Sequence, residues 1–324
     1  MAWRLRLVPE KTNIDFFRIQ WATFGLSIAA MVLSLVLIFT MGLNLGIDFR
    51  GGTTIRTEST TAVDVGTYRE ALSAEDFGDV SISEVSDPSF RDDQHVAMIR
   101  ISARDGQEAV TPEDIASLEA ALKAVDPAIT FPAVESVGPK VSSELITSAL
   151  LAVFAGAAGI LVYVWFRFEW QFAVGTVAAL VHDVLVTVGI FALFQIKFDL
   201  TIVAALLTIL GYSVNDTVVI FDRLRENLAK YKQMPLREMM NLTANETLSR
   251  TIMTASTTLI SLVALLIFGG DVIRGFVFAM LLGVILGTYS TLYMAKNIVL
   301  MLGVDRGDKP KASSDKNEFA NVDA

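Results

Sequence analysis

Two aspartates lie inside long apolar stretches of this sequence, where a charged side chain is costly. Asp183 follows His182 near the middle of one stretch, and Asp216 follows Asn215 in the next stretch along the chain. An ionisable group at the centre of a bilayer costs about 2.5–3.5 kcal/mol on insertion scales, so such residues normally face the interior of a helix bundle and have a function. These four residues are therefore the first candidates for chemistry.

A proton relay is the chemistry that fits them best. A carboxylate that is both desolvated and close to a guanidinium can switch between its protonated and ionised forms. Arg250 stands at the start of another apolar stretch, and its side chain is long enough to reach the depth of Asp216. We interpret Asp216 and Arg250 as the proton relay, with His182, Asp183 and Asn215 as candidate accessory residues. Purely structural hydrogen bonds between helices remain an open alternative for both aspartates.

Other kinds of site have less support. The sequence contains no Walker loop, no H-E-x-x-H motif and no cysteine, so nothing in it indicates ATP hydrolysis or a zinc site. An intramembrane aspartyl protease needs two aspartates on neighbouring helices, which Asp183 and Asp216 supply. Its Gly-x-Gly-Asp signature is absent. We therefore expect no enzyme activity, no metal and no cofactor.

The elements that must position these residues are membrane-spanning helices. The chain has 324 residues, of which 53% are hydrophobic and 19% charged, and its mean hydropathy is +0.52. Soluble domains are less apolar and carry more charge, and a net charge of −9 argues against nucleic acid as a partner. Six stretches approach the roughly 20 apolar residues that a bilayer requires; they are approximately residues 21–41, 145–166, 172–196, 200–221, 252–268 and 276–295.

The segment between the first two spans has a different composition. Residues 44–144 carry 19 Asp and Glu against 8 Lys and Arg, a net charge of −11. Apolar periodicity and turn residues predict a β-α-β-β-α-β order, which is typical of a ferredoxin-like α+β fold. The expected elements are strands at 53–58, 80–85, 95–101 and 129–136, and helices at 63–73 and from 112 onward.

The distribution of Lys and Arg predicts the orientation. Four lie in residues 1–20, six in 222–251 and five from Lys296 onward, whereas the short connections on the opposite side hold only Lys197 and Arg274. By the positive-inside rule both termini should be cytoplasmic and residues 44–144 periplasmic.

The domain organisation follows from this orientation. We expect an amphipathic cytoplasmic loop that lies at the membrane interface. The small residues Gly283 and Gly287 are expected to allow close helix contact. The predicted parts are a cytoplasmic N-terminus (1–20), a first span (21–43), the periplasmic domain (44–144), a five-helix bundle (145–302) with the amphipathic loop at 222–251, and a disordered cytoplasmic tail (303–324).

Six motifs in this order resemble the SecF family of bacterial protein-export membrane proteins, over nearly the whole chain. The matching pieces are Gly46-Ile-Asp-Phe-Arg-Gly-Gly52, Glu135-Ser-Val-Gly-Pro-Lys-Val-Ser142, Val181-His-Asp-Val184, Gly211-Tyr-Ser-Val-Asn-Asp-Thr-Val-Val-Ile-Phe-Asp-Arg-Leu-Arg-Glu-Asn227, Ser249-Arg-Thr-Ile-Met-Thr254 and Gly283…Gly287-Thr-Tyr-Ser290. A single glycine motif is weak, but six in order are specific.

The resemblance implies a half-unit of the resistance–nodulation–division superfamily in the bacterial inner membrane. Such a half works beside a homologous SecD half and the SecYEG translocon, and it uses the proton gradient to help draw the translocating polypeptide out of the channel. The family's relay aspartate and arginine correspond to Asp216 and Arg250. A proton-driven efflux transporter of the same superfamily and an assembly factor without proton chemistry remain alternatives.

The periplasmic domain would then move as a rigid body. The links at its base are Gly51-Gly52 and Gly138-Pro139, which we interpret as hinges. Plain turns at the edge of a domain are an equal alternative for both.

Overall fold

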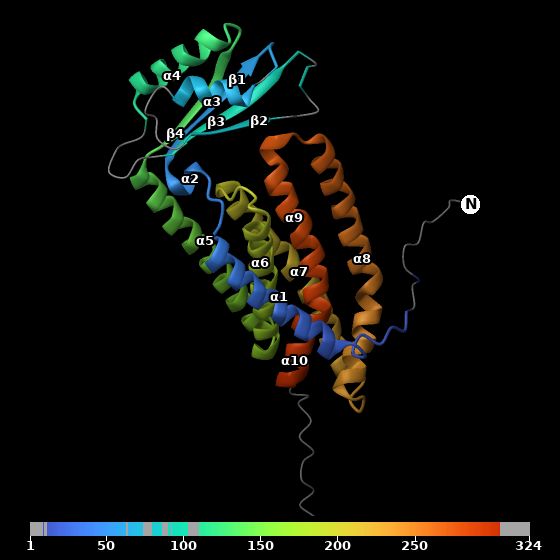
Figure 1. Cartoon of the computed structure of the whole chain (residues 1–324). Coiled ribbons are helices and arrows are strands. Elements are labelled where there is room, and N and C mark those ends of the chain that lie inside the picture. Colours follow the sequence, from blue (N-terminus) through green and yellow to red (C-terminus); the bar gives the residue numbers. More distant parts are fainter. Residues whose placement is uncertain are drawn as a thin grey trace, which may run out of the picture.

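The computed structural model describes residue 9 and residues 12–62, 64–73, 80–85, 90–91, 93–102 and 110–304. In this part of the chain, six helices are long and apolar enough to cross a membrane, and a small α+β domain stands at one end of their bundle (Figure 1). This arrangement confirms the predicted fold class. The end of the bundle next to the α+β domain is called the domain end below, and the opposite end the far end.

The α+β domain is inserted between the first two long helices. Its elements are β1 (Gly52–Ser59), α3 (Val65–Ser73), β2 (Val80–Val85), β3 (His95–Ser102), α4 (Pro112–Val125) and β4 (Thr130–Val137). The strands form one antiparallel sheet in the order β2-β3-β1-β4. This is the ferredoxin-like order that the sequence predicts.

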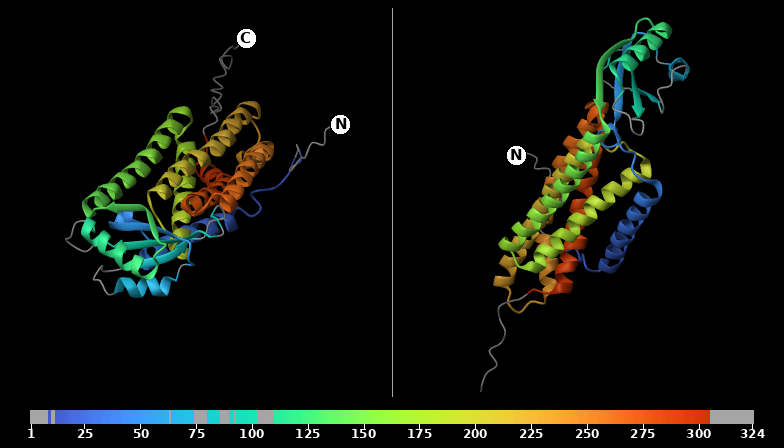
Figure 2. Two further views of the ribbon diagram at one scale, coloured as in Figure 1. Left: turned by 90° about the horizontal axis from the view of Figure 1, so that it is seen from above. Right: turned by 90° about the vertical axis from the view of Figure 1, so that its left-hand side faces the viewer.

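Alternating apolar residues build the core of this domain. Ile55, Ile99 and Ile101 are fully buried, and they pack with Leu118 and Leu122 of α4. Helices α3 and α4 therefore cover one face of the sheet (Figure 2). The predicted start of α4 is confirmed by its capping box: Thr111 Oγ1 accepts a hydrogen bond from Asp114 N at 3.2 Å, and Asp114 Oδ2 accepts one from Thr111 N at 3.0 Å.

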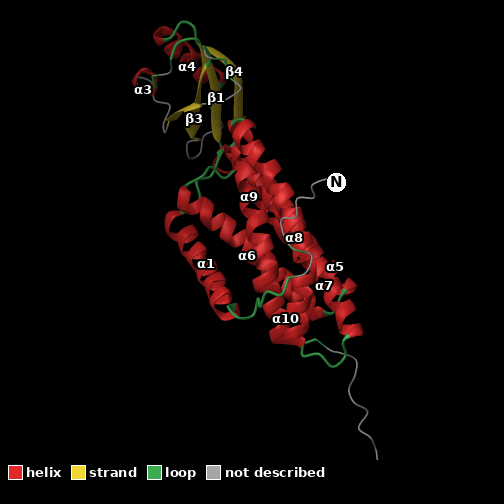
Figure 3. Cartoon of the chain, turned by 90° about the vertical axis from the view of Figure 1, so that its right-hand side faces the viewer, coloured by secondary structure: helices red, strands yellow, loops and turns green. Residues whose placement is uncertain are grey.

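Long helices make up the rest of the described chain (Figure 3). They are α1 (Gln20–Met41), α5 (Pro139–Arg167), α6 (Trp170–Phe194), α7 (Leu200–Lys230), α8 (Leu236–Phe268) and α9 (Asp271–Ser290); α9 continues through a π-helical turn, η1 (Thr291–Ala295), into α10 (Lys296–Leu302). One short helix, α2 (Ile47–Arg50), joins α1 to the sheet. No pattern in the sequence predicted α2.

The prediction of an amphipathic loop at residues 222–251 is wrong. Helix α7 runs without a break to Lys230, and α8 begins at Leu236, so only residues 231–235 form the turn of a helical hairpin. The apolar side of the hairpin does not lie against lipid, because Leu224, Met239, Met240 and Ala244 are buried in a shared core. Amphipathicity marks a buried face in either setting, and here other helices cover that face.

Small residues bring the helices into close contact. A Cβ added to Gly283 of α9 would overlap Ile209 of α7, and one added to Gly287 would lie 3.1 Å from Ser213 Cβ. This confirms the close packing expected at these two glycines. Helix α7 consequently lies against α9 over its central turns.

A segment before α1 is docked on the far end of the bundle. Asn245 of α8 pairs with the backbone of Ile14: its Oδ1 accepts from Ile14 N at 2.8 Å, and its Nδ2 donates to Ile14 O at 2.9 Å. Phe16 and Phe17 are buried, and the Lys296 Nζ lies 4.8 and 4.2 Å from their ring centroids. The tail predicted to be disordered lies almost entirely in residues 305–324, outside the described residues.

Candidate functional site

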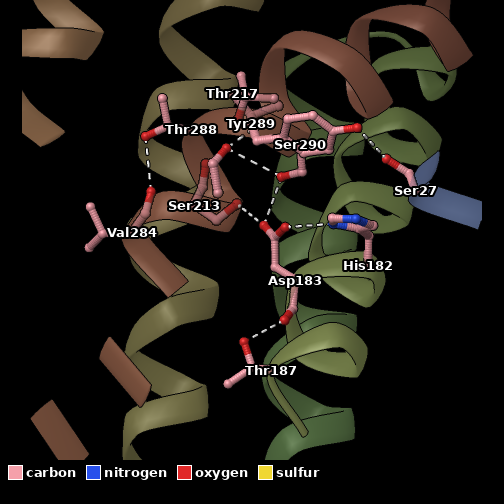
Figure 4. A network of polar contacts seen from close by, with 12 residues as sticks. Ser27, His182, Asp183, Thr187, Ser213, Thr217, Val284, Thr288, Tyr289 and Ser290 are labelled. Carbon is pink, nitrogen blue, oxygen red and sulfur yellow. Dashed lines mark hydrogen bonds and ion pairs between the residues drawn. The ribbon is translucent and has the colours of Figure 1, made fainter. Parts of the chain in front are cut away.

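Asp183 is the centre of a buried polar cluster that joins three helices (Figure 4). Its Oδ2 accepts hydrogen bonds from Ser213 Oγ of α7 at 2.7 Å and from Ser290 Oγ of α9 at 2.8 Å. Its Oδ1 lies 2.9 Å from His182 Nδ1, and its backbone oxygen accepts a bond from Thr187 Oγ1. The Asp183 side chain is fully buried, and both of its oxygens have partners.

His182 extends this cluster toward α1. Its ring lies 5.9 Å from the ring of Tyr289, centroid to centroid. The Tyr289 hydroxyl donates to Thr23 O at 2.8 Å and accepts from Ser27 Oγ at 3.0 Å (Figure 4). Asp183 and its partners thus join α6, α7 and α9, and Tyr289 of α9 adds the link to α1.

Asp216 has a different environment. It lies on α7 three residues after Ser213, and only 4% of its surface is exposed. Its Oδ2 is buried and accepts no hydrogen bond from any described residue. A buried carboxylate without a partner is expensive, and in a natural protein it needs an explanation such as a change of protonation state.

Arg250 of α8 is the cation that acts on Asp216. The two residues interact electrostatically, but within the described chain they do not form an ion pair. The Arg250 side chain is exposed and lines a groove of about 480 Å³ between α5, α7 and α8. Other charges in this groove are already paired: Arg223 Nε lies 2.8 Å from Glu246 Oε2, and Arg167 Nη2 lies 3.1 Å from Asp222 Oδ1.

Asn215, the neighbour of Asp216, does not join either cluster. It lies on an open stripe along α7, between the neighbouring helices α5 and α8. The stripe has the spacing of one helical face, and its exposed members are small or polar: Ala204, Thr208, Gly211 and Asn215. Nothing within the described chain covers them.

The predicted hinge residues lie at the base of the α+β domain. Gly51 and Gly52 are buried and have φ values of +74° and +125°, which favour glycine. Gly138 has a φ of −73° and precedes α5, which begins at Pro139. These angles fit a tight turn on the first link and a helix start on the second, and the hinge role stays a prediction.

Some members of the site were missed by the sequence analysis. One is Ser290, which donates a hydrogen bond to Asp183. The only signal in the sequence was its position three residues after Gly287, on the helix face toward α7. Lys296 lies outside this site but was missed as well: it is 1% exposed, and its Nζ has no hydrogen-bond partner among the described residues. Among those residues there is also no cluster of three or more His, Asp or Glu that would suit a metal ion.

Comparisons with known proteins agree on one family. The model of the "Protein export membrane protein SecD/SecF, C-terminal" family matches residues 117–305, and that of the SecD/SecF GG motif matches residues 36–63. The first match covers more than half of the chain.

Curated relatives extend this similarity to the full length. The chain is 71% identical to the protein translocase subunit SecF of Cereibacter sphaeroides over 324 residues, which is 100% of both chains. It is 37% identical to the protein translocase subunit SecDF of Brucella abortus over 94% of this chain and 40% of that protein.

A solved structure has the same fold. The crystal structure of SecDF from Thermus thermophilus, described as a translocon-associated membrane protein, matches with a TM-score of 0.80 and 33% identity. The match covers 91% of this chain and 39% of the SecDF chain. This chain therefore spans about two fifths of that solved relative.

Proposed function

The chain belongs to the SecF branch of the SecD/SecF family of protein-export membrane proteins, and we propose that it uses a transmembrane proton gradient to drive polypeptide release. In this proposal Asp216 takes up and gives off the proton, and Arg250 stabilises its ionised form. No cofactor is needed, because the gradient is the energy source.

The unpartnered carboxylate of Asp216 carries the proposal. Asp183 and Asp216 are buried on neighbouring helices, but Asp183 has hydrogen bonds to both oxygens and Asp216 Oδ2 has none. A carboxylate whose two oxygens both accept hydrogen bonds must give up at least one of them when it takes up a proton, whereas Asp216 Oδ2 is free to receive one. The nearby, unpaired Arg250 supplies the charge with which the ionised form can pair.

The energy available is sufficient for a change of helix packing. One proton that crosses about 150 mV releases roughly 3.5 kcal/mol, from about 2.3 kcal/mol per charge per 100 mV. In the ionised state Asp216 is drawn toward Arg250, and α7 and α8 approach each other. In the protonated state that attraction is lost, and the helices relax.

The open stripe on α7 supports a SecD-like partner half. Helices in a membrane associate through small residues and through polar side chains that bond across the contact, and Ala204, Thr208, Gly211 and Asn215 are of these kinds. This chain covers only 40% and 39% of the two relatives named SecDF. These relatives are therefore more than twice as long as this chain. A second half on this face fits both observations.

The proposal also includes an orientation and a site of action. The Lys and Arg distribution supports cytoplasmic termini and a periplasmic α+β domain, and the similarity to SecF proteins supports the bacterial inner membrane. A solved relative is described as translocon-associated. We extend a translocon association to the present chain, and we propose SecYEG and the translocating polypeptide as its partners.

The first test is Asp216→Asn in inverted membrane vesicles that contain the partner half and the translocon. Asparagine cannot carry a proton, so we expect the gradient-stimulated part of export to be lost while the amount of the protein in the membrane stays unchanged. Export that keeps its full dependence on the gradient would refute the relay and would favour an assembly factor without proton chemistry.

Arg250→Met tests the second relay residue. It removes the charge that acts on Asp216, and we expect the same loss of gradient stimulation. Arg225→Met is the matched control, because Arg225 is exposed on α7 and contacts Arg167 O and the Phe168 ring. Equal losses in the two variants would indicate a general effect of surface charge.

A further inference from the structure

The joint between the α+β domain and the bundle is built from two segments that are distant in sequence. Residues 42–46, which follow α1, pair with the loop between α6 and α7 as a short parallel bridge at Leu45 and Phe198. Phe198 N donates to Asn44 O, and Gly46 N donates to Phe198 O, both at 2.8 Å. The first residues after α1 are therefore fixed to the residues that lead into α7.

Asp48 continues this connection into the first turn of α7. Its Oδ2 accepts a hydrogen bond from Leu200 N at 3.0 Å. Asp199, the residue before the helix, accepts from Thr201 N and Ile202 N at 3.1 and 3.3 Å. The free N–H groups that begin every helix are thus shared here between a local aspartate and one that is 152 residues away in sequence.

Asp48 itself belongs to the base of the α+β domain. It lies on α2, which is separated from β1 by Gly51 alone. The neighbouring Phe49 packs against Phe198, with ring centroids 6.0 Å apart, and Ile47 O accepts a bond from Ser142 Oγ of α5 at 3.3 Å. A displacement of the first turn of α7 would therefore act on α2 and then on the sheet.

Helix α7 also carries Asp216. It is one uninterrupted helix from Leu200 to Lys230, and Asp216 lies 16 residues after Leu200, about 24 Å along the axis at 1.5 Å per residue. A rigid helix of this length moves at both ends when it shifts along its axis. Helix α7 therefore both carries Asp216 and contacts the base of the α+β domain.

From these contacts we propose that Asp48 is a positioning residue that couples α7 to the α+β domain. Its bond to Leu200 N makes the base of the domain follow the domain end of α7, so the joint acts as a clamp and not as a free hinge. The coupling part of this proposal rests on the proposed function, whereas the clamp itself does not depend on it.

Distance measurements test the clamp. The chain contains no cysteine, so spin labels can be attached to Ala120→Cys on α4 and Val272→Cys on α9, both of which are exposed. In the full chain we expect a narrow distance distribution, which Asp48→Ala broadens because it removes the acceptor. Asp48→Asn should keep the narrow distribution, since its amide oxygen still accepts from Leu200 N.

Asp64→Ala is the matched control for the distances. Asp64 caps α3 within the domain by bonds to Gly66 N and Thr67 N and has no link to α7, so its loss should leave the distribution narrow. A distribution in Asp48→Ala as narrow as in the unsubstituted chain would overturn the clamp. Equal broadening in Asp64→Ala would overturn the assignment to Asp48.

The coupling is tested with the partner half and the translocon present, by measuring proton uptake and export separately. We expect Asp48→Ala to keep gradient-driven proton uptake and to lose gradient-stimulated export, and Asp48→Asn to restore export. Loss of both activities together would overturn the coupling role. A failure of the proposed relay can be distinguished from a failure of the clamp. If the relay is wrong, Asp216→Asn keeps its gradient-stimulated export. The distance distributions test the clamp in either case.

Discussion

At the scale of single residues, a buried carboxylate in an apolar bundle is tolerated only when its charge is compensated. Asp183 is compensated by three donors from two other helices and from its own neighbour. Asp216 has no such set, and a single cation acts on it from α8. This difference separates an aspartate that holds helices together from one that is available to exchange a proton.

The α+β domain contains a further buried ionisable residue, and it predicts a dependence of stability on pH. The Tyr68 hydroxyl donates to Asp126 Oδ2 at 2.9 Å, and burial raises the pKa of Tyr68 above its ordinary value of 10.0. A group whose pKa is higher in the folded state stabilises the fold fully below its unfolded pKa and loses this effect as the pH rises. We therefore expect the free energy of unfolding of the domain to fall above pH 10.

Tyr68→Phe should weaken this dependence. At neutral pH, the free energy of unfolding of the variant is expected to be lower by about 0.5–1.5 kcal/mol, the usual contribution of one hydrogen bond. Above pH 10, it should fall less with pH than that of the unsubstituted chain. Urea unfolding of the full chain, followed by a fluorophore on Ala120→Cys, measures both quantities. Tyr163→Phe, at an exposed position of α5, is the control; identical slopes in all three chains would contradict the assignment.

The identity of the candidate site residues was predictable, but most of their partners were not. Asp183, Asp216 and Arg250 stand out because their charges interrupt or border apolar stretches. The bonds of Asp183 to Ser213 and Ser290 depend on which helices are neighbours, and a serine in an apolar run is too common to indicate a contact. Sequence alone therefore could not separate the saturated aspartate from the unpartnered one.

At the scale of helices, apolar length predicted the six spans but not where the helices end. Helices α7 and α8 continue well past the bilayer-length stretches, to Lys230 and from Leu236. Their extra turns are polar on one side and are covered by each other and by the segment around Phe17. A hydropathy pattern detects the membrane portion of such a helix, but it does not distinguish burial against protein from burial against lipid.

Leucine substitutions at two glycines should have different effects, because Gly283 lies at the contact between α9 and α7 and Gly211 lies on the open stripe of α7. Gly283→Leu should separate α9 from Ile209 and destabilise the purified protein by about 1–3 kcal/mol, the usual cost of overpacking. Gly211→Leu fills an open position with no atom within 4 Å, so the thermal stability of the chain alone should be unchanged. It should nevertheless reduce co-purification with the partner half, because it obstructs the stripe on α7.

Thermal unfolding in detergent and pull-down of the partner half measure the two effects. Full recovery of the partner half with Gly211→Leu would contradict the assignment of the stripe as the contact face. An undiminished melting temperature in Gly283→Leu would contradict the tight contact between α7 and α9.

At the scale of the whole molecule, the segment before α1 connects the first helix to α8 and α10. Asn245 binds the backbone of Ile14, Asn241 Oδ1 accepts from Phe16 N at 3.0 Å, and Arg237 donates to Phe17 O. Helix α1 packs mainly along α6, so this segment supplies its link to α8 and α10. No pattern in the sequence marked the segment, because its partners are amides at one end of a long helix.

Asn245→Leu tests whether the segment depends on these bonds. Each bond is worth about 0.5–1.5 kcal/mol, so loss of two should make the amides of Ile14 and Phe16 exchange hydrogen at least about fivefold faster, as measured by mass spectrometry. Asn215→Leu is the control, since its amide lies on the open face of α7. Unchanged exchange at Ile14 in the Asn245 variant would show that the buried phenylalanines alone hold the segment.

The π-helical turn at residues 291–295 divides the last span into two parts with different phase. Such a turn accommodates one additional residue within an otherwise α-helical path, so the side-chain directions after it are rotated relative to those before it. Gly283, Gly287 and Ser290 face α7 and Asp183, while Lys296 reaches the rings of Phe16 and Phe17. The last helix can therefore satisfy two unrelated neighbours, and loss of a single residue from this turn would leave only one of them correctly aligned.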